Sequence, residues 1–245
     1  MLNKNQMSQK SAKNFVDNIE KNLYLSIQEK INSITFKLEK VLNAFSNSHL
    51  NVQHFASLTG YGHGDLGRDI IDKIFADVLE AEKAAVRLQL VSGTHAITSS
   101  LFGVLRPGDN LLSVTGRPYE SLEEVIGLRG NGQGSLIEFG INYEEISLKN
   151  DGNIDFLALE KALKIPRKLI FIQRSCGYTW RPSLSIDVIK EICNLCHKIQ
   201  PNCICFVDNC YGEFVENKEP TSVGADLIAG SLIKNLGGTI VPTGG

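Results

Sequence analysis

The sequence predicts a three-layer α/β/α fold around a mainly parallel sheet, preceded by an N-terminal helical segment. Two observations carry this prediction. From Val86 onward, short apolar runs alternate with segments of helical period, a pattern that places helices on both faces of a parallel sheet. The run Leu169–Ile172 is continuously apolar, as is typical of a strand buried on both faces.

The N-terminal part has a different pattern. Residues 1–12 are polar and predict a disordered tail, whereas apolar residues over 13–46 recur mostly every three or four positions and predict helix. Either this domain or a neighbouring subunit must cover the resulting apolar stripe. We therefore expect a tail and helical segment over 1–45 and one large domain over 46–245. The stripe consists of Phe15, Val16, Ile19, Leu23, Ile27, Ile31, Ile34 and Leu38.

The elements of the large domain follow in order. Segment 56–68 holds four glycines with His63 and Arg68, and is too specialised for a plain linker. Turn residues such as Pro107-Gly-Asp109 separate the later elements. Helices are expected at 69–82, 95–105, 119–128, 155–164 and 185–199. Strands are expected at 86–91, 110–115, 135–139, 143–148, 168–173, 203–207 and 226–230.

Composition narrows the class of protein. The 245 residues are 42% hydrophobic and 21% charged, enough for one large globular core. The formal net charge is −2, which gives no sign of a nucleic-acid partner. No apolar run approaches the roughly 18 residues of a spanning helix, and the polar N-terminus lacks a secretory apolar segment. We expect a cytoplasmic protein with no membrane partner.

Six cysteines cluster in the last third of the chain, where a reducing cytoplasm disfavours disulfides. Cys193–His197 matches the C-x-x-C-H pattern of haem attachment, but it falls within an expected helix. Adding Cys203 and Cys205 makes a conceivable zinc set. Because the second pair lies in an expected buried strand, where cysteine acts as a small hydrophobe, we predict no metal site.

A carboxylate and a lysine carry the strongest chemical signal. Asp208 ends the apolar run Phe206–Val207, and Lys234 lies 26 residues later in a loop of small residues. Such a pair suits pyridoxal phosphate (PLP): the lysine forms a Schiff base with the cofactor, and the aspartate keeps its pyridine nitrogen protonated. Most lysines are solvated surface charges and most Val-Asp pairs simply end a strand, so this pair needs support from the rest of the chain.

Two further segments supply that support. Gly93, Thr94 and His95 open an expected helix, whose free N–H groups make an anion site suited to a phosphate. The alternative is a plain strand–helix turn capped by serine or threonine. Ser231, in the loop of Lys234, is a candidate donor to the same phosphate. In open α/β sheets, ligands bind beyond the carboxyl ends of the strands, where these loops are expected.

The chain resembles fold type I PLP enzymes. Within them it is most similar to the methionine gamma-lyase-like or "aluminium resistance" proteins of cysteine and methionine metabolism. The resemblance runs from about residue 40 to the end. It is carried by Thr59–Arg68, Val91–Ala96, Phe206–Phe214 and Ala229–Gly238.

The resemblance implies a role for each matching residue. Lys234 matches the Schiff-base lysine and Asp208 the partner of the pyridine nitrogen, while Gly93, Thr94 and Ser231 match the phosphate cradle. Tyr61 resembles a tyrosine that reaches the phosphate of a neighbouring subunit, and Arg68 could pair with that phosphate. A homodimer or homotetramer is therefore expected. Relatives continue into a small C-terminal domain that is absent after Gly245.

Some positions depart from the pattern. Thr115 stands where transsulfuration enzymes have a ring-stacking tyrosine, and Tyr119 is the nearest aromatic substitute, with His95 as its rival. Arg174 begins the segment where relatives carry an asparagine near the cofactor hydroxyl. Ile233 stands in place of a hydroxyl-bearing residue. These departures concern contacts with the cofactor rather than its presence.

The resemblance implies a carbon–sulfur lyase acting on a sulfur-containing amino acid by β- or γ-elimination. Lys234 would be the general base at Cα, and Tyr119 or Tyr61 would be the acid for the leaving sulfur. Transamination and side-chain cleavage on the same scaffold stay open, because a fold does not decide chemistry. A non-catalytic, truncated PLP-binding fragment is a further alternative.

Overall fold

The computed structural model describes residues 4–56, 61–238 and 240–245. Its centre is a sheet of five parallel strands in the order β2-β1-β3-β4-β5. The strands are β1 Asn110–Ser113, β2 Asn142–Glu145, β3 Leu169–Gln173, β4 Ile204–Asp208 and β5 Leu227–Ala229. The predicted parallel α/β fold is confirmed.

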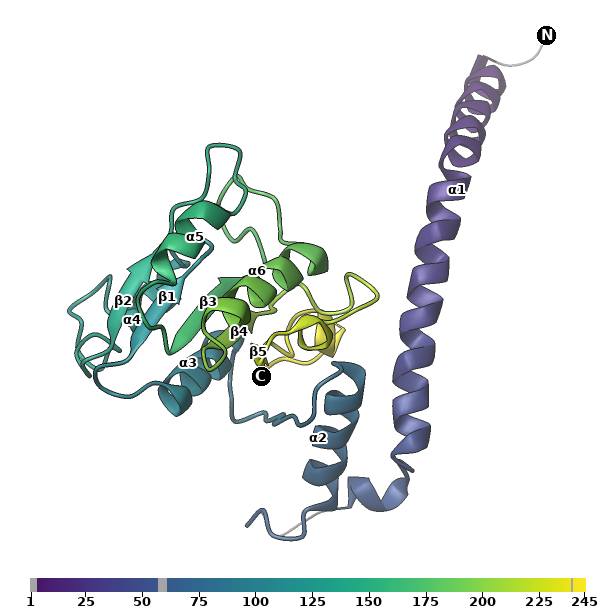
Figure 1. Cartoon of the computed structure of the whole chain (residues 1–245). Coiled ribbons are helices and arrows are strands. Elements are labelled where there is room, and N and C mark those ends of the chain that lie inside the picture. The colour runs from purple at the N-terminus through teal and green to yellow at the C-terminus, as the bar shows by residue number, and fades with distance from the viewer. Residues whose placement is uncertain (1–3, 57–60, 239) are drawn as a thin grey trace.

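Helices cover both faces of this sheet (Figure 1). On one face, α3 (Gly93–Val104) and α4 (Glu120–Ile126) bury apolar side chains against the strands. On the other, α5 (Phe156–Ala162) and α6 (Ile186–Ile199) form the larger core cluster. The sheet is therefore the middle of three layers, as the alternation of apolar runs and helical segments predicts.

The alternation of side chains along β4 shows how one strand serves both cores. Phe206 faces α3 and α4 and meets Phe171 of β3 edge to face, with ring centroids 5.7 Å apart. Cys205 and Val207 point to the opposite face, toward α6. Because successive side chains of a strand point to opposite faces, both sets must be apolar, which explains the continuous apolar runs.

Two expected strands are not strands in the structure, which corrects the sequence prediction. Segment 86–91 is irregular because, among the described residues, only Gly245 pairs with it, through two backbone hydrogen bonds with Arg87. Segment 135–139 forms turns between Gly134 and Gly140, both with positive φ. The glycines at both ends favour turns, and this local preference outweighed the apolar content that predicted a strand.

The N-terminal helix α1 (Lys4–Asn47) is longer than predicted, so most of the expected disordered tail is helical. Its lysines, glutamines and alanines are good helix formers and extend the helix without apolar periodicity. The last part of α1 packs on α2 (Leu66–Val78) through Ala44, and the Lys40 ammonium lies 3.0 Å from a Glu80 carboxylate oxygen.

Most of the apolar stripe of α1 is exposed in this chain, including Phe15 at 68% and Ile34 at 63%. Figure 1 shows the N-terminal part of α1 extending away from the sheet. The large domain covers α1 only around Val41 and Ala44, beyond the stripe, so cover by a neighbouring subunit stays a prediction. Short 3₁₀ turns complete the described elements: η1 Val52–Phe55, η2 Pro220–Val223 and η3 Asn235–Gly237.

A search of the described residues for a helix able to cross a membrane finds none that combines the necessary length and apolarity.

Candidate active site

The predicted site residues come from loops at the carboxyl ends of adjacent strands. β4 ends at Asp208, and its neighbour β5 leads into the loop of Ser231 and Lys234. α3 begins beside them at Gly93, since a side-chain carbon at that glycine would lie 3.0 Å from Ser231 Cβ. Parallel pairing brings these segments together because all the carboxyl ends of the strands lie at one edge of the sheet.

Asp208 is 1% exposed, and its Oδ1 accepts a hydrogen bond of 3.1 Å from the backbone N–H of Cys210. Burial raises the pKa of this carboxyl, while the Cys210 amide and the charge of Lys234 act in the opposite direction. A buried carboxylate of this kind is stabilised by a cation placed against it.

Lys234 is half-buried in the loop after β5, just before the turn η3. Its ammonium lies 4.1 Å from the centroid of the Tyr211 ring, a cation–π contact that holds the flexible side chain over the loop after β4. Tyr211 itself has a φ of 66°, an uncommon backbone conformation for a tyrosine. The lysine is thereby held at the same edge of the sheet as Asp208.

A tight, polar junction joins the start of α3 to the loop of Lys234. A Cβ at Gly93 would lie 2.9 Å from Cys210 Sγ, so only glycine allows this close approach. The hydroxyl of Ser231 is fully buried and has no hydrogen-bond partner in the described structure. Since an unsatisfied buried hydroxyl is costly, this group is suited to bind a ligand oxygen.

The structure distinguishes the two aromatic candidates. Burial and, to a lesser degree, the charge of Asp208 raise the pKa of Tyr119, which is partly buried. His95 is exposed, and its Nδ1 accepts a 3.3 Å hydrogen bond from the Val91 amide. Tyr119 is thus partly buried and within electrostatic influence of Asp208, whereas the exposed His95 ring contacts the preceding loop, and the choice between them stays a prediction.

The Thr115 hydroxyl makes a backbone contact, which differs from the ring stacking of the tyrosine that transsulfuration enzymes have at this position. It accepts a 3.1 Å hydrogen bond from the backbone N–H of Gln173, at the end of β3. It thereby ties the loop after β1 to the neighbouring strand.

The glycine-rich segment before α2 is only partly described, because residues 57–60 lie outside the described residues. Tyr61 is 85% exposed and is not brought into the site of its own chain. Arg68 pairs with Asp65, the N-cap of α2, with 3.1 Å between Arg68 Nε and Asp65 Oδ2. The roles expected of both residues toward a neighbouring subunit stay predictions.

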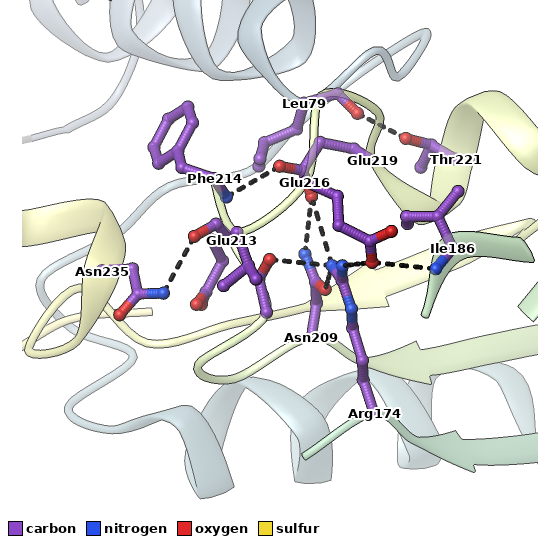
Figure 2. Close-up of polar contacts among 12 residues, drawn as sticks. Leu79, Arg174, Ile186, Asn209, Glu213, Phe214, Glu216, Glu219, Thr221 and Asn235 are labelled. Atoms are coloured by element: carbon purple, nitrogen blue, oxygen red, sulfur yellow. Dashed lines mark hydrogen bonds and ion pairs between the residues drawn. The ribbon is translucent and has the colours of Figure 1, made fainter. Parts of the chain in front are cut away.

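Arg174, noted in the sequence only as a departure from the family pattern, is a buried clamp on the loop after β4. It follows β3 and is 3% exposed. Its Nη1 donates to Asn209 Oδ1 and to the Gly212 carbonyl, both at 2.8 Å, and its Nη2 donates to Glu216 Oε1 at 2.8 Å (Figure 2). The guanidinium thus fixes the chain directly after Asp208.

Glu219 completes this network. Its two oxygens accept hydrogen bonds from Asn209 Nδ2 at 3.0 Å and from the Phe214 amide at 2.9 Å (Figure 2). The Glu219 amide in turn donates to Glu80 at 3.0 Å, which ties the loop to the end of α2. Sequence reasoning missed this network because its members lie up to 139 residues apart.

Glu213 is a second residue that sequence reasoning missed. It is 1% exposed, and both carboxylate oxygens lack a hydrogen-bond partner in the described structure. Burial raises its pKa to about 7, against the opposing influence of the nearby backbone amides of Glu213 and Ser231 and of the Lys234 charge. Glu213 also lines a mostly apolar cavity of about 340 Å³ between the end of β5 and segment 81–86. No short motif marks it, because its burial arises from tertiary packing.

The comparison with known families agrees with this geometry. A family model described as methionine gamma-lyase matches residues 12–245. The chain belongs to the methionine gamma-lyase family. The matched region covers the whole sheet and every candidate residue described above.

Solved structures similar to this methionine gamma-lyase family member extend the comparison. A carbon–sulfur lyase involved in aluminium resistance from Clostridium novyi NT is 47% identical, with a TM-score of 0.85; the match covers 100% of this chain and 60% of that one. A candidate cystathionine β-lyase involved in aluminium resistance from Listeria monocytogenes is 46% identical, with a TM-score of 0.91, over 95% of this chain and 59% of that one.

The curated relatives of this family member include both a close and a distant sequence. The uncharacterized protein YnbB of Bacillus subtilis is 51% identical over 221 residues, 89% of this chain and 52% of that protein. An L-methionine gamma-lyase of Pseudomonas putida is 26% identical over 182 residues, 73% of this chain and 40% of that protein. The chain thus spans about half the length of the curated relatives it matches.

Proposed function

We propose that this chain is the cofactor-binding part of a PLP-dependent carbon–sulfur lyase that acts on sulfur-containing amino acids. The observation that carries the proposal is the meeting of Asp208 and Lys234 at the ends of adjacent strands, in a family whose relatives include carbon–sulfur lyases. Because relatives are longer than this chain, the activity proposed is that of the whole protein.

The residues present fit the cofactor. Asp208 is a buried carboxylate whose raised pKa would fall beside a protonated pyridine nitrogen. The unpartnered hydroxyl of Ser231 and the start of α3 at Gly93 and Thr94 would hold a phosphate. Lys234 supplies the amine that would bond to the cofactor aldehyde. When bound, PLP withdraws electrons from the substrate Cα.

The chain's own residues would then move protons. Lys234, once its amine is free and neutral, takes the proton from the substrate Cα as general base. The hydroxyl of Tyr119 gives a proton to the leaving sulfur. Its pKa, raised mainly by burial, keeps that hydroxyl protonated at neutral pH. Loss of the thiol and addition of water give a keto acid, ammonia and a thiol.

A neighbouring copy would complete the site. Tyr61 is exposed, as a residue that acts in another subunit would be, and we propose that it reaches the phosphate of the neighbouring copy in a homodimer or homotetramer. Its place at the edge of a loop with positive φ at Gly62 and Gly64 suits such an extension.

Absorbance spectroscopy of the purified chain with added PLP tests the proposal. We expect a visible band that borohydride bleaches, absent in Lys234→Ala and retained in Lys168→Ala, which changes a lysine at the start of β3 far from the site. A folded wild-type chain without the band, or a band that persists in Lys234→Ala, would contradict the assignment of Lys234.

Product analysis of the full-length protein tests the reaction. Release of thiol and ammonia from a sulfur amino acid supports elimination, while conversion of the cofactor to its amine form indicates transamination instead. Tyr119→Phe should lower the elimination rate by about 10²-fold, as expected for loss of a general acid. Unchanged elimination in Tyr119→Phe would remove that residue from the mechanism without affecting the cofactor assignment.

A further inference from the structure

Four cysteine thiols meet in the core at the end of β4 opposite to the candidate active site. They form a group that we call the thiol cluster: Cys193, Cys196, Cys203 and Cys205. Cys203 precedes β4 and Cys205 lies within it, so the i, i+2 spacing places both on the face toward α6. Cys193 and Cys196 lie one helical turn apart on the facing side of α6.

His197, the residue after Cys196, lies at the rim of this cluster with its side chain 30% exposed. One ring nitrogen and the sulfurs of Cys203 and Cys205 all lie within 4.8 Å of one another. In a tetrahedral zinc site with 2.3 Å bonds, sulfurs are about 3.8 Å apart, so a small closure of these side chains would bring them to coordination distance.

Cys196, on the buried face of α6, is the candidate for a fourth ligand, although it lies outside the three groups that are all within 4.8 Å of one another. Its thiol lies within hydrogen-bonding reach of those of Cys203 and Cys205. A three-sulfur, one-nitrogen set is among the usual compositions of structural zinc sites.

The surroundings of His197 fit a metal ligand better than a core histidine. Its Nε2 lies 2.9 Å from Asp226 Oδ2, and the same oxygen accepts a 2.7 Å hydrogen bond from the Cys205 amide. With its proton on Nε2 facing this carboxylate, the ring keeps the lone pair of Nδ1 for a metal. Ligating histidines usually donate their other N–H to a carboxylate in this way.

We propose that this chain has a structural zinc site with the ligands Cys196, His197, Cys203 and Cys205. The site ties the C-terminal end of α6 to the start of β4. The strand geometry places it about 16 Å from Asp208, since five residues of strand separate Cys203 from that carboxylate. Zn²⁺ would displace the thiol protons to solvent as it binds, and its function is to stabilise the fold rather than to take part in the reaction.

Metal analysis of the whole chain, purified under reducing conditions and stripped with a chelator, tests this site. After Zn²⁺ is added back to the stripped chain, we expect about one Zn²⁺ per chain to be retained after gel filtration, with a raised melting temperature. Co²⁺ added instead should give the strong visible bands of tetrahedral thiolate coordination. A folded chain that retains no zinc and shows no such bands with Co²⁺ would overturn the proposal, and the cysteines would then serve only as apolar packing.

Variants at His197 and Asp226 test the ligand set without changing a buried thiol. His197→Gln changes a rim residue that is compatible with folding and should weaken the Co²⁺ bands strongly. Asp226→Asn keeps an acceptor for the Cys205 amide and should lower Zn²⁺ affinity about 10–100-fold. Cys176→Ser, outside the cluster, is the matched control and should bind as the wild type does. Equal binding by all three variants would contradict the assignment. Because none requires PLP, the outcome is independent of the proposed lyase function.

Discussion

The two ends of β4 show how one strand can serve two different kinds of chemistry. At the carboxyl end, Asp208 and Asn209 are buried polar groups held by backbone amides and by Arg174. At the amino end, Cys203 and Cys205 are buried thiols among apolar side chains of α6. Buried carboxylates and amides need partners, whereas thiols pack as small hydrophobes. The carboxyl end therefore depends on a long-range polar network, whereas at the amino end the buried thiols pack among apolar groups and are available to the proposed zinc ion.

The largest expected effect comes from removing the clamp at the carboxyl end. Arg174→Met should lower the free energy of unfolding by about 3–5 kcal/mol, because it leaves the buried carboxylate of Glu219 without its cation. Urea denaturation followed by circular dichroism measures this change. The exposed pair of Arg129 with Glu120 offers a control, and Arg129→Met should leave the midpoint unchanged. Equal effects of the two variants would show that the network is not what supports this end of β4.

The pH dependence of stability gives a second test of how the carboxyl end of β4 differs from its amino end. The pKa of Glu213 is about 7 in the folded chain, against an ordinary value of 4.5, so the folded state binds this proton more tightly than the unfolded state. Stability should therefore fall as pH rises from about 4.5 to 7, by on the order of 3 kcal/mol.

Glu213→Gln should reduce that decline and make the chain more stable than the wild type above pH 7, while the raised pKa values of Asp208 and Glu219 leave a smaller decline. Thermal melts from pH 5 to about pH 8 measure the difference. Glu160→Gln, at an exposed position of α5, is the control and should keep the wild-type profile. A Glu213→Gln profile that declines as steeply as that of the wild type would assign the pH dependence to other groups.

Asp208→Asn tests whether the buried carboxylate acts on the cofactor. The variant keeps the shape and an acceptor for the Cys210 amide but loses the charge, so turnover of the full-length protein should fall about 10²-fold. The absorbance band of Lys234 with PLP should persist with reduced cofactor affinity. Asp151→Asn, in the turn before α5, should have wild-type turnover. Unimpaired turnover in Asp208→Asn would remove the ring-nitrogen role.

The smallest effect is expected at the amino end of β4. Cys193 is fully buried and lies outside the proposed ligand set, so Cys193→Ala should cost about 1 kcal/mol of stability through lost apolar burial. Zn²⁺ binding should be unchanged. Loss of zinc in this variant would instead move Cys193 into the ligand set.

Local sequence patterns were sufficient for the sheet and for much of the site. The buried runs that became β3 and β4 and the amphipathic α6 were predicted within one or two residues, because apolar period reflects burial directly. Segments 86–91 and 135–139 were predicted wrongly as strands. Apolar content alone does not create a strand, which needs a neighbouring backbone to receive its hydrogen bonds.

The motif residues Gly93, Asp208 and Lys234 could be identified from their order along the chain, since each follows or precedes a recognisable element. Their meeting at one edge is a consequence of parallel topology, which the alternation of strands and helices already implied. The sequence favours Tyr119 over His95 by position, but their different surroundings, partly buried for Tyr119 and exposed for His95, arise only in the folded chain.

The pattern of residues along the chain thus predicts the fold class, the order in which the site loops follow one another, and the family. Tertiary structure alone decided that Arg174 clamps Asn209, that Glu213 is buried without a partner, and that His197 meets the thiols of the β4 end. The physical reason is that burial of polar and thiol groups depends on contacts between segments far apart in the chain. Such contacts carry no local period, so they are visible only once the sheet has aligned β3, β4 and β5.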